Sequence, residues 1–203
     1  MPLLKVTDTG NAIVYLWRIE ESVEELLAGV NLREASSTRL SSMKSEVHKQ
    51  GFLSIRQLLK VAGYSDSELL YDTNGKPYLT DKKCISISHS FQYATIIISN
   101  ENVGIDIEMK REKIKRIAAK FCSLNELAAV EESDNDILEL TTIWCAKEAM
   151  FKMCDSRSLS FKDHMSVDVR QSICEVNAKA FNKQFSFESV DLEDFLLVYA
   201  FEK

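Results

Sequence analysis

Two short segments with different hydrophobic periods constrain this chain more than any other feature of its sequence. The first runs from Val103 to Glu108 and reads V-G-I-D-I-E, so that Asp106 and Glu108 alternate with two isoleucines. On a β-strand, residues two apart point to the same face, which puts both carboxylates on one face and both isoleucines on the other. The segment therefore predicts a strand with one apolar face and one acidic face.

The second segment follows about forty residues later, at 144–152, and reads W-C-A-K-E-A-M-F-K. Glu148 and Lys152 are four residues apart, so a helix would place them on one edge, where they could also form an ordinary surface ion pair. Carboxylates gathered from a strand and a helix favour a cation, and hard oxygen ligands suit magnesium, which keeps waters and substrate phosphates as further ligands. We therefore predict that magnesium is held by Asp106, Glu108 and Glu148, and that the substrate carries phosphate.

Composition limits the classes of protein that the chain can belong to. With 203 residues, 45% of them hydrophobic, it can bury a core as one domain or as two compact halves. No apolar run approaches the ~20 residues of a membrane span, and the first residues lack a secretory signal. The net charge of −6 gives no general attraction to nucleic acid. We expect a cytoplasmic protein that binds neither nucleic acid nor membrane.

The cysteines do not suggest a disulfide framework or a zinc site. There are five, an odd number, and no pair has C-x-x-C spacing. We therefore expect buried free thiols.

The hydrophobic pattern predicts that each half of the chain runs from a strand through helices to further strands. We expect strands at 11–19, 69–71, 85–87, 93–99, 103–108, 184–190 and 195–201. Helices are expected from residue 21, through 52–62, over 114–121, after a capping box at Ser123 and Glu126, and over 137–153. We place the boundary between the halves near Asn100.

With these segments the chain resembles the 4′-phosphopantetheinyl transferase superfamily. Its hallmark is a (V/I)-G-(I/V)-D strand followed by (F/W)-(S/T/C)-x-K-E-(A/S)-x-x-K. Three further segments agree with the larger, surfactin-synthetase-activator-like type: G-K-P at 75–77, S-I-S-H-S at 86–90 and K-F-C-S-L-N-E at 120–126. The resemblance implies an α+β fold of two similar halves related by pseudo-twofold symmetry, with coenzyme A held between them. Residues 1–100 would contact its phosphates and adenosine, and residues 101–203 would carry the metal site.

The resemblance also implies an activity, the magnesium-dependent transfer of 4′-phosphopantetheine from coenzyme A to a serine of an acyl- or peptidyl-carrier protein. The expected coenzyme A contacts are Arg56, Lys76, Ser88, His89, Lys147 and Lys152. Glu148 is the first choice for the base that accepts the serine proton and Glu126 the second, with Lys152 as a further catalytic residue. A capping box alone would explain Glu126, and His89 could be an ordinary hydrogen-bonded loop histidine.

Several expectations concern partners and alternatives. The basic residues at 110–120 could attract an acidic carrier protein or form a solvated surface. Relatives often have glycines after the position of Lys152, whereas this chain reads D-S-R-S at 155–158, so contacts from that turn are in doubt. We expect a monomer. The alternative functions are a catalytically silent coenzyme-A-binding module and a magnesium-dependent phosphohydrolase.

Overall fold

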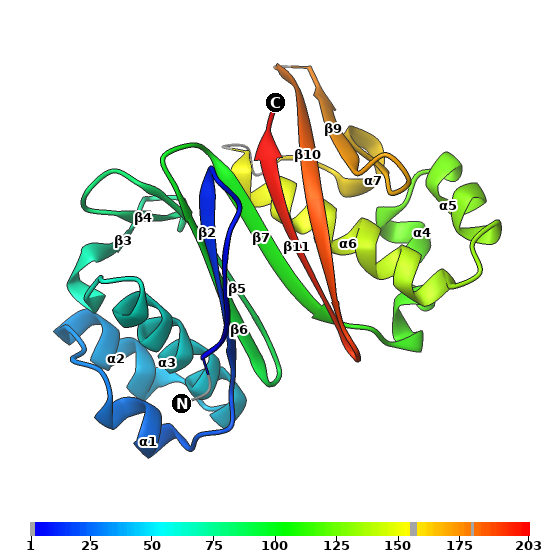
Figure 1. Cartoon of the computed structure of the whole chain (residues 1–203). Helices are drawn as coiled ribbons and strands as arrows, with labels where there is room; N and C mark the ends of the chain where they lie inside the picture. Colours follow the sequence, from blue (N-terminus) through cyan, green and yellow to red (C-terminus); the bar gives the residue numbers. More distant parts are fainter. Residues whose placement is uncertain (1–2, 155–157, 180) are drawn as a thin grey trace. The chain divides into compact units, whose positions relative to one another are not determined.

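The computed structural model of the protein describes residues 3–154, 158–179 and 181–203. The chain divides into two compact units, Met1–Glu101 and Asn102–Lys203, each built from helices and an antiparallel sheet (Figure 1). The expected α+β class is therefore confirmed. None of the helices in the described ranges combines the length and apolar character needed to span a bilayer. Residues 155–157, where the sequence predicts a turn, lie outside the described residues.

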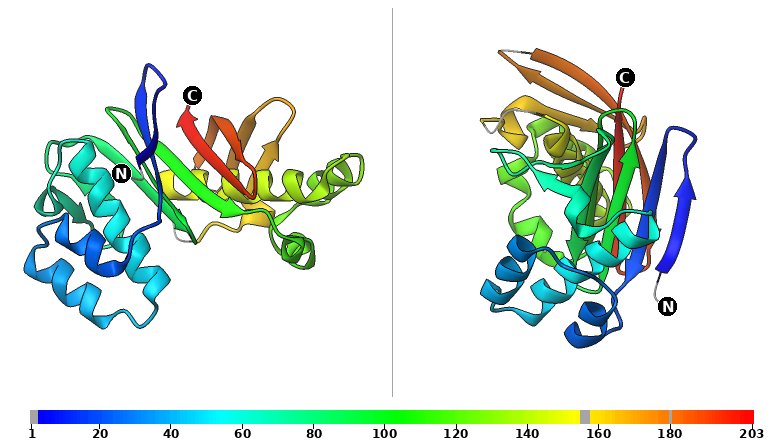
Figure 2. Two further views of the ribbon diagram at one scale, coloured as in Figure 1. Left: turned by 60° about the horizontal axis from the view of Figure 1, so that its bottom comes forward. Right: turned by 90° about the vertical axis from the view of Figure 1, so that its left-hand side faces the viewer.

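Unit 1 gathers its helices on one side of its strands (Figure 2). Its strands are β1 Leu3–Asp8, β2 Ala12–Arg18, β3 Leu69–Tyr71, β4 Pro77–Leu79, β5 Cys84–Ser90 and β6 Tyr93–Ser99. Its helices are α1 Val23–Ala28, α2 Glu34–Ser42, α3 Glu46–Val61 and the 3₁₀ turn η1 Asp66–Glu68. The longest, α3, begins at Ser45, whose side chain accepts the backbone N–H of His48.

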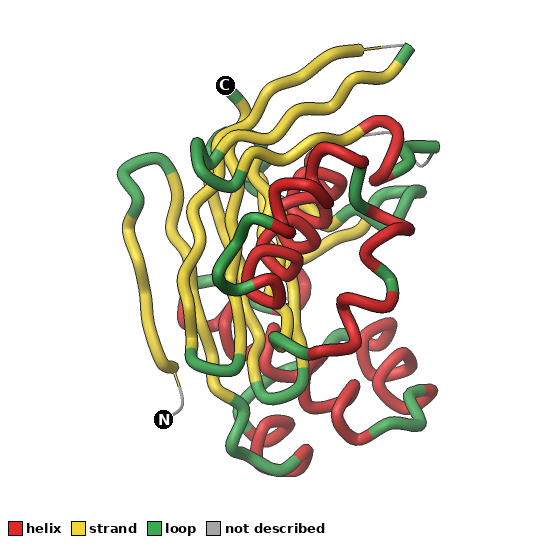
Figure 3. The backbone as a smooth tube through the Cα atoms, turned by 90° about the vertical axis from the view of Figure 1, so that its right-hand side faces the viewer, coloured by secondary structure: helices red, strands yellow, loops and turns green. Residues whose placement is uncertain are grey.

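Unit 2 is likewise built from helices and strands (Figure 3). Its longest helix is α6. Its strands are β7 Val103–Met109, β8 Met165–Asp168, β9 Ile173–Ala178, β10 Phe181–Leu192 and β11 Phe195–Glu202. Its helices are the 3₁₀ turn η2 Glu112–Arg116, α4 Ala118–Phe121, α5 Leu124–Glu131, α6 Asp136–Met153 and α7 Phe161–His164. Helix α6 begins at Asn135, whose side chain accepts the N–H of Leu138.

The two sheets repeat one topology. The strand order is β1-β2-β6-β5-β4-β3 in unit 1 and β7-β11-β10-β9-β8 in unit 2. Apart from the added edge strand β1, each unit makes one strand, then helices, then four antiparallel strands, the last of which pairs with the first. The two halves are thus similar in fold, and their pseudo-twofold relation stays a prediction.

Each unit has its own apolar core between its helices and its sheet. In unit 1 the core is centred on Leu53, Leu58 and Leu59 of α3. In unit 2 it is centred on α6, where Ala149 and Met150 are fully buried. Four of the five cysteines are buried free thiols as expected, and Cys84 is half-buried.

The prediction of one continuous helix over 114–121 is wrong. The structure has a 3₁₀ turn at Glu112–Arg116 and then the short helix α4. The backbone N–H of Ile117 donates to Ile114 O, an i to i−3 bond that tightens the chain there. Lys115 in this turn forms an ion pair with Asp136 at the start of α6, which draws the turn toward another element.

Candidate functional site

Strand β7 presents its two acids toward α6. Asp106 and Glu108 lie opposite Val198 and Leu196 of β11, two residues that belong to the core built on α6. The alternating Ile105 and Ile107 are buried on the other face of the strand. The alternation in the sequence thus puts both carboxylates on the face that meets the helix.

Gly104 allows β7 to come close to the backbone of α6. A Cβ atom at this position would lie 2.0 Å from Ala149 O and 2.7 Å from its carbonyl carbon. No side chain fits such a distance from backbone atoms, so only glycine permits this approach. Because Asp106 is two residues along the strand and Glu148 adjoins Ala149, the same close approach brings strand and helix carboxylates near each other.

The electrostatics of Glu148 show that the three acids are within reach of one another. The pKa of Glu148 is raised to about 7, first by burial and then by the negative charges of Asp106 and Glu108, against the opposing charge of Lys152. The neighbouring Cys145 responds in the same way, because burial first and then both β7 acids raise the pKa of its thiol. The site therefore concentrates negative charge in a partly desolvated region.

Lys152 supplies a positive charge at this place. Its ammonium donates to Ile105 O at 2.7 Å and to Asp106 Oδ1 at 2.9 Å, and 27% of the side chain is exposed. The sequence also permits a surface ion pair between Lys152 and Glu148. In the structure, both of these hydrogen bonds of Lys152 are made to β7. Lys152 therefore links α6 to the acidic strand and keeps one side toward solvent.

The donor set fits a hard divalent cation in its chemistry. Three carboxylates that repel one another, one of them with a raised pKa, favour a cation that relieves the repulsion. Within the described ranges, however, no three or more His, Cys, Asp or Glu residues stand grouped as a ready ligand set. Ion binding would therefore require the flexible side chains of Glu108 and Glu148 to turn toward Asp106.

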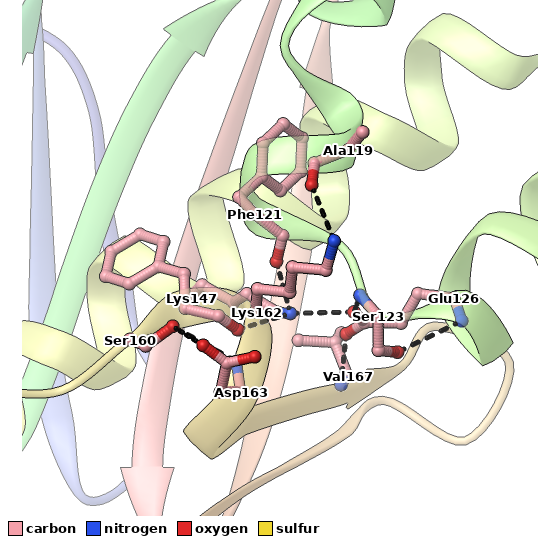
Figure 4. Close-up of polar contacts among 10 residues, drawn as sticks. Ala119, Phe121, Ser123, Glu126, Lys147, Ser160, Lys162, Asp163 and Val167 are labelled. Carbon is pink, nitrogen blue, oxygen red and sulfur yellow. Dashed lines mark hydrogen bonds and ion pairs between the residues drawn. The ribbon is translucent and has the colours of Figure 1, made fainter.

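Lys147 does not lie where a phosphate could reach it, which corrects the expectation from the sequence. Its side chain is fully buried and its ammonium donates to Phe121 O at 2.8 Å, Phe161 O at 2.8 Å and Glu126 Oε2 at 2.7 Å (Figure 4). An ammonium has three protons to donate, and all three have acceptors. Burial lowers the pKa of Lys147, while the hydrogen bond and charge of Glu126 oppose this effect.

Glu126 is equally committed to structure, which argues against its expected role as a base. It closes the capping box of α5 by accepting the N–H of Ser123 at 2.7 Å, and its Oε1 accepts the N–H of Val167 at 2.9 Å. Only 5% of the residue is exposed. With Lys147 it joins α4, α5, α6, α7 and β8 into one network, so the capping-box interpretation is the better one (Figure 4).

Arg56 is a second correction. Its Nε donates to Asp66 Oδ1 at 2.9 Å, its Nη1 donates to Phe52 O at 3.2 Å, and its guanidinium lies 3.5 Å from the centre of the Phe52 ring. The residue is 4% exposed. Asp66 also accepts from Arg33 N and Ser36 Oγ, so this buried ion pair ties α2, α3 and η1 together. Arg56 therefore stabilises unit 1 and is not available to coenzyme A in this arrangement.

The other expected contacts in unit 1 remain at its surface or half-buried. His89 is exposed near the end of β5, and Ser88 before it is half-buried. Lys76 precedes β4 in a turn held by Asp72, whose carboxylate accepts the backbone N–H of Lys76 at 2.9 Å. None of these three residues is fully buried, and their role as coenzyme A contacts stays a prediction.

The sequence interpretation missed Gly51, which lies beneath the ring of His89. A Cβ at Gly51 would be 2.9 Å from both Cγ and Nδ1 of the imidazole. A glycine in the middle of a helical pattern was the available signal, because such a residue needs a packing or functional reason.

The basic stretch is only partly available to a partner. Lys110 pairs with Asp191 at 2.6 Å, and Lys115 pairs with Glu112 and Asp136. Lys113 and Arg116 are exposed on η2.

Unit 2 also contains a hollow of about 510 Å³ between α5, α6 and strands β8 and β9. Its lining residues include Glu139, Asp168 and Arg170 but not the three acids beside Lys152. The hollow is therefore separate from the candidate metal site.

Comparisons with known proteins point to one family. The family model described as the 4′-phosphopantetheinyl transferase superfamily matches residues 102–200, which contain every carboxylate of the candidate site. A curated relative, 4′-phosphopantetheinyl transferase gsp of Aneurinibacillus migulanus, is 32% identical over 107 residues, or 50% of this chain and 45% of the relative. The chain thus aligns with about half the length of this relative.

Among solved structures, the chain is similar to the holo-[acyl-carrier-protein] synthase (AcpS) of Neisseria meningitidis. The sequence identity is 19% and the TM-score is 0.40, with 50% of this chain and 97% of the other covered.

Proposed function

Because residues 102–200 match the family model of the 4′-phosphopantetheinyl transferase superfamily, we propose that the protein transfers 4′-phosphopantetheine from coenzyme A to a serine of an acyl- or peptidyl-carrier protein. The observation that carries this proposal is the meeting of Asp106 and Glu108 with Glu148 and Lys152 at the contact of β7 and α6. All four residues lie inside the segment that matches the family.

The reaction is a phosphoryl transfer at the pyrophosphate of coenzyme A. The serine Oγ forms a bond to the phosphorus that carries the pantetheine arm, and the bond from that phosphorus to the bridging oxygen breaks. Adenosine 3′,5′-bisphosphate leaves, and the serine proton passes to a base. Catalysis of this kind rests on positioning and on neutralising charge at the phosphate oxygens.

The three carboxylates would hold a divalent cation at the pyrophosphate. Magnesium, when bound, would neutralise charge on the phosphate oxygens. Asp106 is already fixed by its bond to Lys152, whereas Glu108 and Glu148 are only partly buried and can turn to complete the set. Lys152 would place a further positive charge next to the same phosphates, because part of its side chain faces solvent.

Glu148 is our choice for the base that accepts the serine proton. It lies beside Asp106 and Lys152, where the pyrophosphate would bind, and it would accept the proton directly or through a water on the bound cation. Glu126 is no longer a candidate, because both of its oxygens accept hydrogen bonds within the buried network.

We assign the phosphate and adenosine end of coenzyme A to Lys76, Ser88 and His89 of unit 1. They combine a cation, a hydroxyl and an imidazole, which are donors for phosphate oxygens. Such contacts act equally on the bound substrate and on the transition state, so we expect Lys76→Ala to weaken binding more than turnover of the bound complex. An unchanged coenzyme A affinity in a calorimetric titration of Lys76→Ala would remove that residue from the site.

The partner would be an acidic carrier protein, for which the exposed residues Lys113 and Arg116 offer a basic surface. These residues begin a few positions after Glu108, so a carrier bound there would be near the candidate metal site. We further propose that the protein acts in the cytoplasm as a monomer, in line with the sequence.

Mass spectrometry of an apo-carrier protein tests the function directly. After incubation with the protein, magnesium and coenzyme A, we expect the carrier to gain ~340 Da, the mass of one phosphopantetheine unit attached through a serine. Glu148→Gln is the matched control, because it keeps the size of the side chain and removes its charge. Consumption of coenzyme A without a carrier would support a phosphohydrolase instead, and binding without consumption would support a silent binding module.

A further inference from the structure

Gly51 is an unexpected residue at its position in the fold. It lies in the interior of α3, the longest helix of unit 1, and is buried although it has no side chain. Glycine is the poorest helix-forming residue after proline, so a helix interior does not favour it without another reason. The reason must therefore lie in what surrounds the Cα atom.

The surroundings of Gly51 are the imidazole of His89. A Cβ at Gly51 would lie 2.9 Å from Cγ, 2.9 Å from Nδ1 and 3.2 Å from Cε1 of that ring, and these are its three nearest atoms. Two of these distances are closer than a Cβ atom tolerates, so any side chain at this position would have to displace the ring. The ring thus occupies the space that the glycine leaves open.

The contact also orients the ring. The Cβ position is nearly equidistant from Cγ, Nδ1 and Cε1, so it lies over the face of the imidazole and not in the ring plane. His48, one helical turn before Gly51, has its ring centre 6.5 Å from that of His89. The helix therefore forms a flat support for His89, with a second imidazole beside it.

We propose that Gly51 is a positioning residue that lets the face of the His89 imidazole lie against α3 and so fixes the ring for contact with a phosphate group of coenzyme A. The proposal rests on the proposed function for the identity of the ligand. Its geometric part, the dependence of the ring position on a glycine at 51, stands on the contacts alone.

The contrast with Gly104 separates this role from simple close packing. A Cβ at Gly104 would meet backbone atoms of Ala149, which cannot move independently of α6. A Cβ at Gly51 would meet only side-chain atoms of His89 among its three nearest neighbours. If His89 were alanine, residue 51 could carry a methyl group without displacing a ring, so the effect of Gly51→Ala must depend on His89.

A double-mutant cycle tests this dependence. Coenzyme A affinity is measured by calorimetric titration for the parent, Gly51→Ala, His89→Ala and the double variant. We expect Gly51→Ala to weaken binding roughly 10-fold, as loss of a charge-assisted hydrogen bond does, and to have no further effect once His89 is alanine. An unchanged affinity in Gly51→Ala, or the same loss in both backgrounds, would overturn the proposal.

Gly29→Ala is the matched control within unit 1. A Cβ there would also meet a side chain, the amide of Gln57, whose nearest atom lies 2.2 Å away and which is flexible. Gly29 has φ of −85°, which alanine adopts without strain. We expect this variant to bind coenzyme A as the parent does, whereas a loss equal to that of Gly51→Ala would mean that any added methyl in the unit disturbs the site.

Two further measurements do not depend on the ligand. The chain has only three histidines, so the Cε1 proton resonance of His89 can be assigned by substitution and should shift in Gly51→Ala without coenzyme A. Gly51→Ala should also raise the melting temperature by about 2–4 °C in the His89→Ala background and not in the parent, because only there does the better helix former fit freely. An unmoved resonance, or the same gain in both backgrounds, would refute the positioning. If the parent itself fails to bind coenzyme A, the proposed function and the ligand assigned to His89 fail, while these two measurements still decide the geometry.

Discussion

Replacing Lys147 with methionine should destabilise unit 2 instead of removing a substrate contact. Methionine keeps a long apolar side chain but has no ammonium, so Phe121 O and Phe161 O lose a donor and the carboxylate of Glu126 loses its ion pair. All of these groups lie in a region where Lys147 is fully buried, and water cannot replace the missing donor without opening the structure.

The expected loss is large for one substitution. Breaking a buried ion pair by removing one partner costs about 3–5 kcal/mol, because the remaining charge stays buried. For a chain of this size that corresponds to a fall in melting temperature of roughly 6–20 °C. Glu126 keeps its hydrogen bonds from Ser123 N and Val167 N, so the lower part of this range is the more reasonable expectation.

The assay can be made specific to this region. The chain has two tryptophans, and Trp144 lies on α6 with its ring 5.0 Å from that of Phe121 and 5.6 Å from that of Phe161. In a Trp17→Phe background, urea unfolding followed by fluorescence reports on Trp144 alone, next to the carbonyl groups that accept from Lys147.

Lys152→Met provides the comparison within the same helix. The side chain of Lys152 is partly exposed and makes two hydrogen bonds, so its loss should cost only about 1–2 kcal/mol but should abolish most transferase turnover. If Lys147→Met instead unfolds within about 1 kcal/mol of its parent and has lost turnover, the reasoning from burial is wrong and Lys147 acts on the substrate.

Three further predictions concern the acids and the partner surface. Asp106→Ala, Glu108→Ala and Glu148→Ala should each reduce turnover by ~100-fold or more while circular dichroism stays native, and a near-normal rate would remove that residue from the site. The folded protein holds a proton on Glu148 up to about pH 7, so the free energy of unfolding should fall as pH rises from 5 to 8, by at most about 3 kcal/mol. Magnesium should stabilise the parent more at pH 8 than at pH 5. Urea unfolding of Glu148→Gln should show neither effect. Lys113→Glu with Arg116→Glu should raise the KM for an acidic carrier and flatten its salt dependence, with coenzyme A affinity unchanged, and an unaltered carrier KM at low salt would contradict a docking role.

Much of the fold follows from local patterns. The alternation of Val103 to Glu108 becomes β7, the capping box at Ser123 begins α5, and the long apolar pattern after residue 136 becomes α6. Strand β1 was not predicted, because Leu3 to Asp8 has no strong alternation and its side chains are mostly exposed. Pairing with β2 forms this strand, and pairing is a tertiary property that a single segment does not encode.

The candidate site could likewise be predicted only in part. The two-residue period of a strand predicts that Asp106 and Glu108 lie on one face. Their close approach to α6 depends on Gly104, a glycine that can be read from the sequence. Arg56 could not be placed from the sequence, because the partner that buries it, Asp66, comes ten residues later in another element. A basic residue expected at a phosphate and a basic residue in a buried ion pair look the same until the partner is known.

The two lysines of α6 show that helix geometry could have carried the sequence interpretation further. An α-helix turns about 100° per residue, so Lys152 lies only about 40° around the axis from Glu148, whereas Lys147 lies about 100° away and about 140° from Lys152. One strand cannot face both lysines. Once Glu148 is taken to face the acids of β7, Lys152 must share that side and Lys147 must turn toward another part of the core, where it needs a carboxylate such as Glu126. A motif with two lysines therefore combines one residue for the site with one for the scaffold that holds it, and the comparison of Lys147→Met with Lys152→Met measures that division.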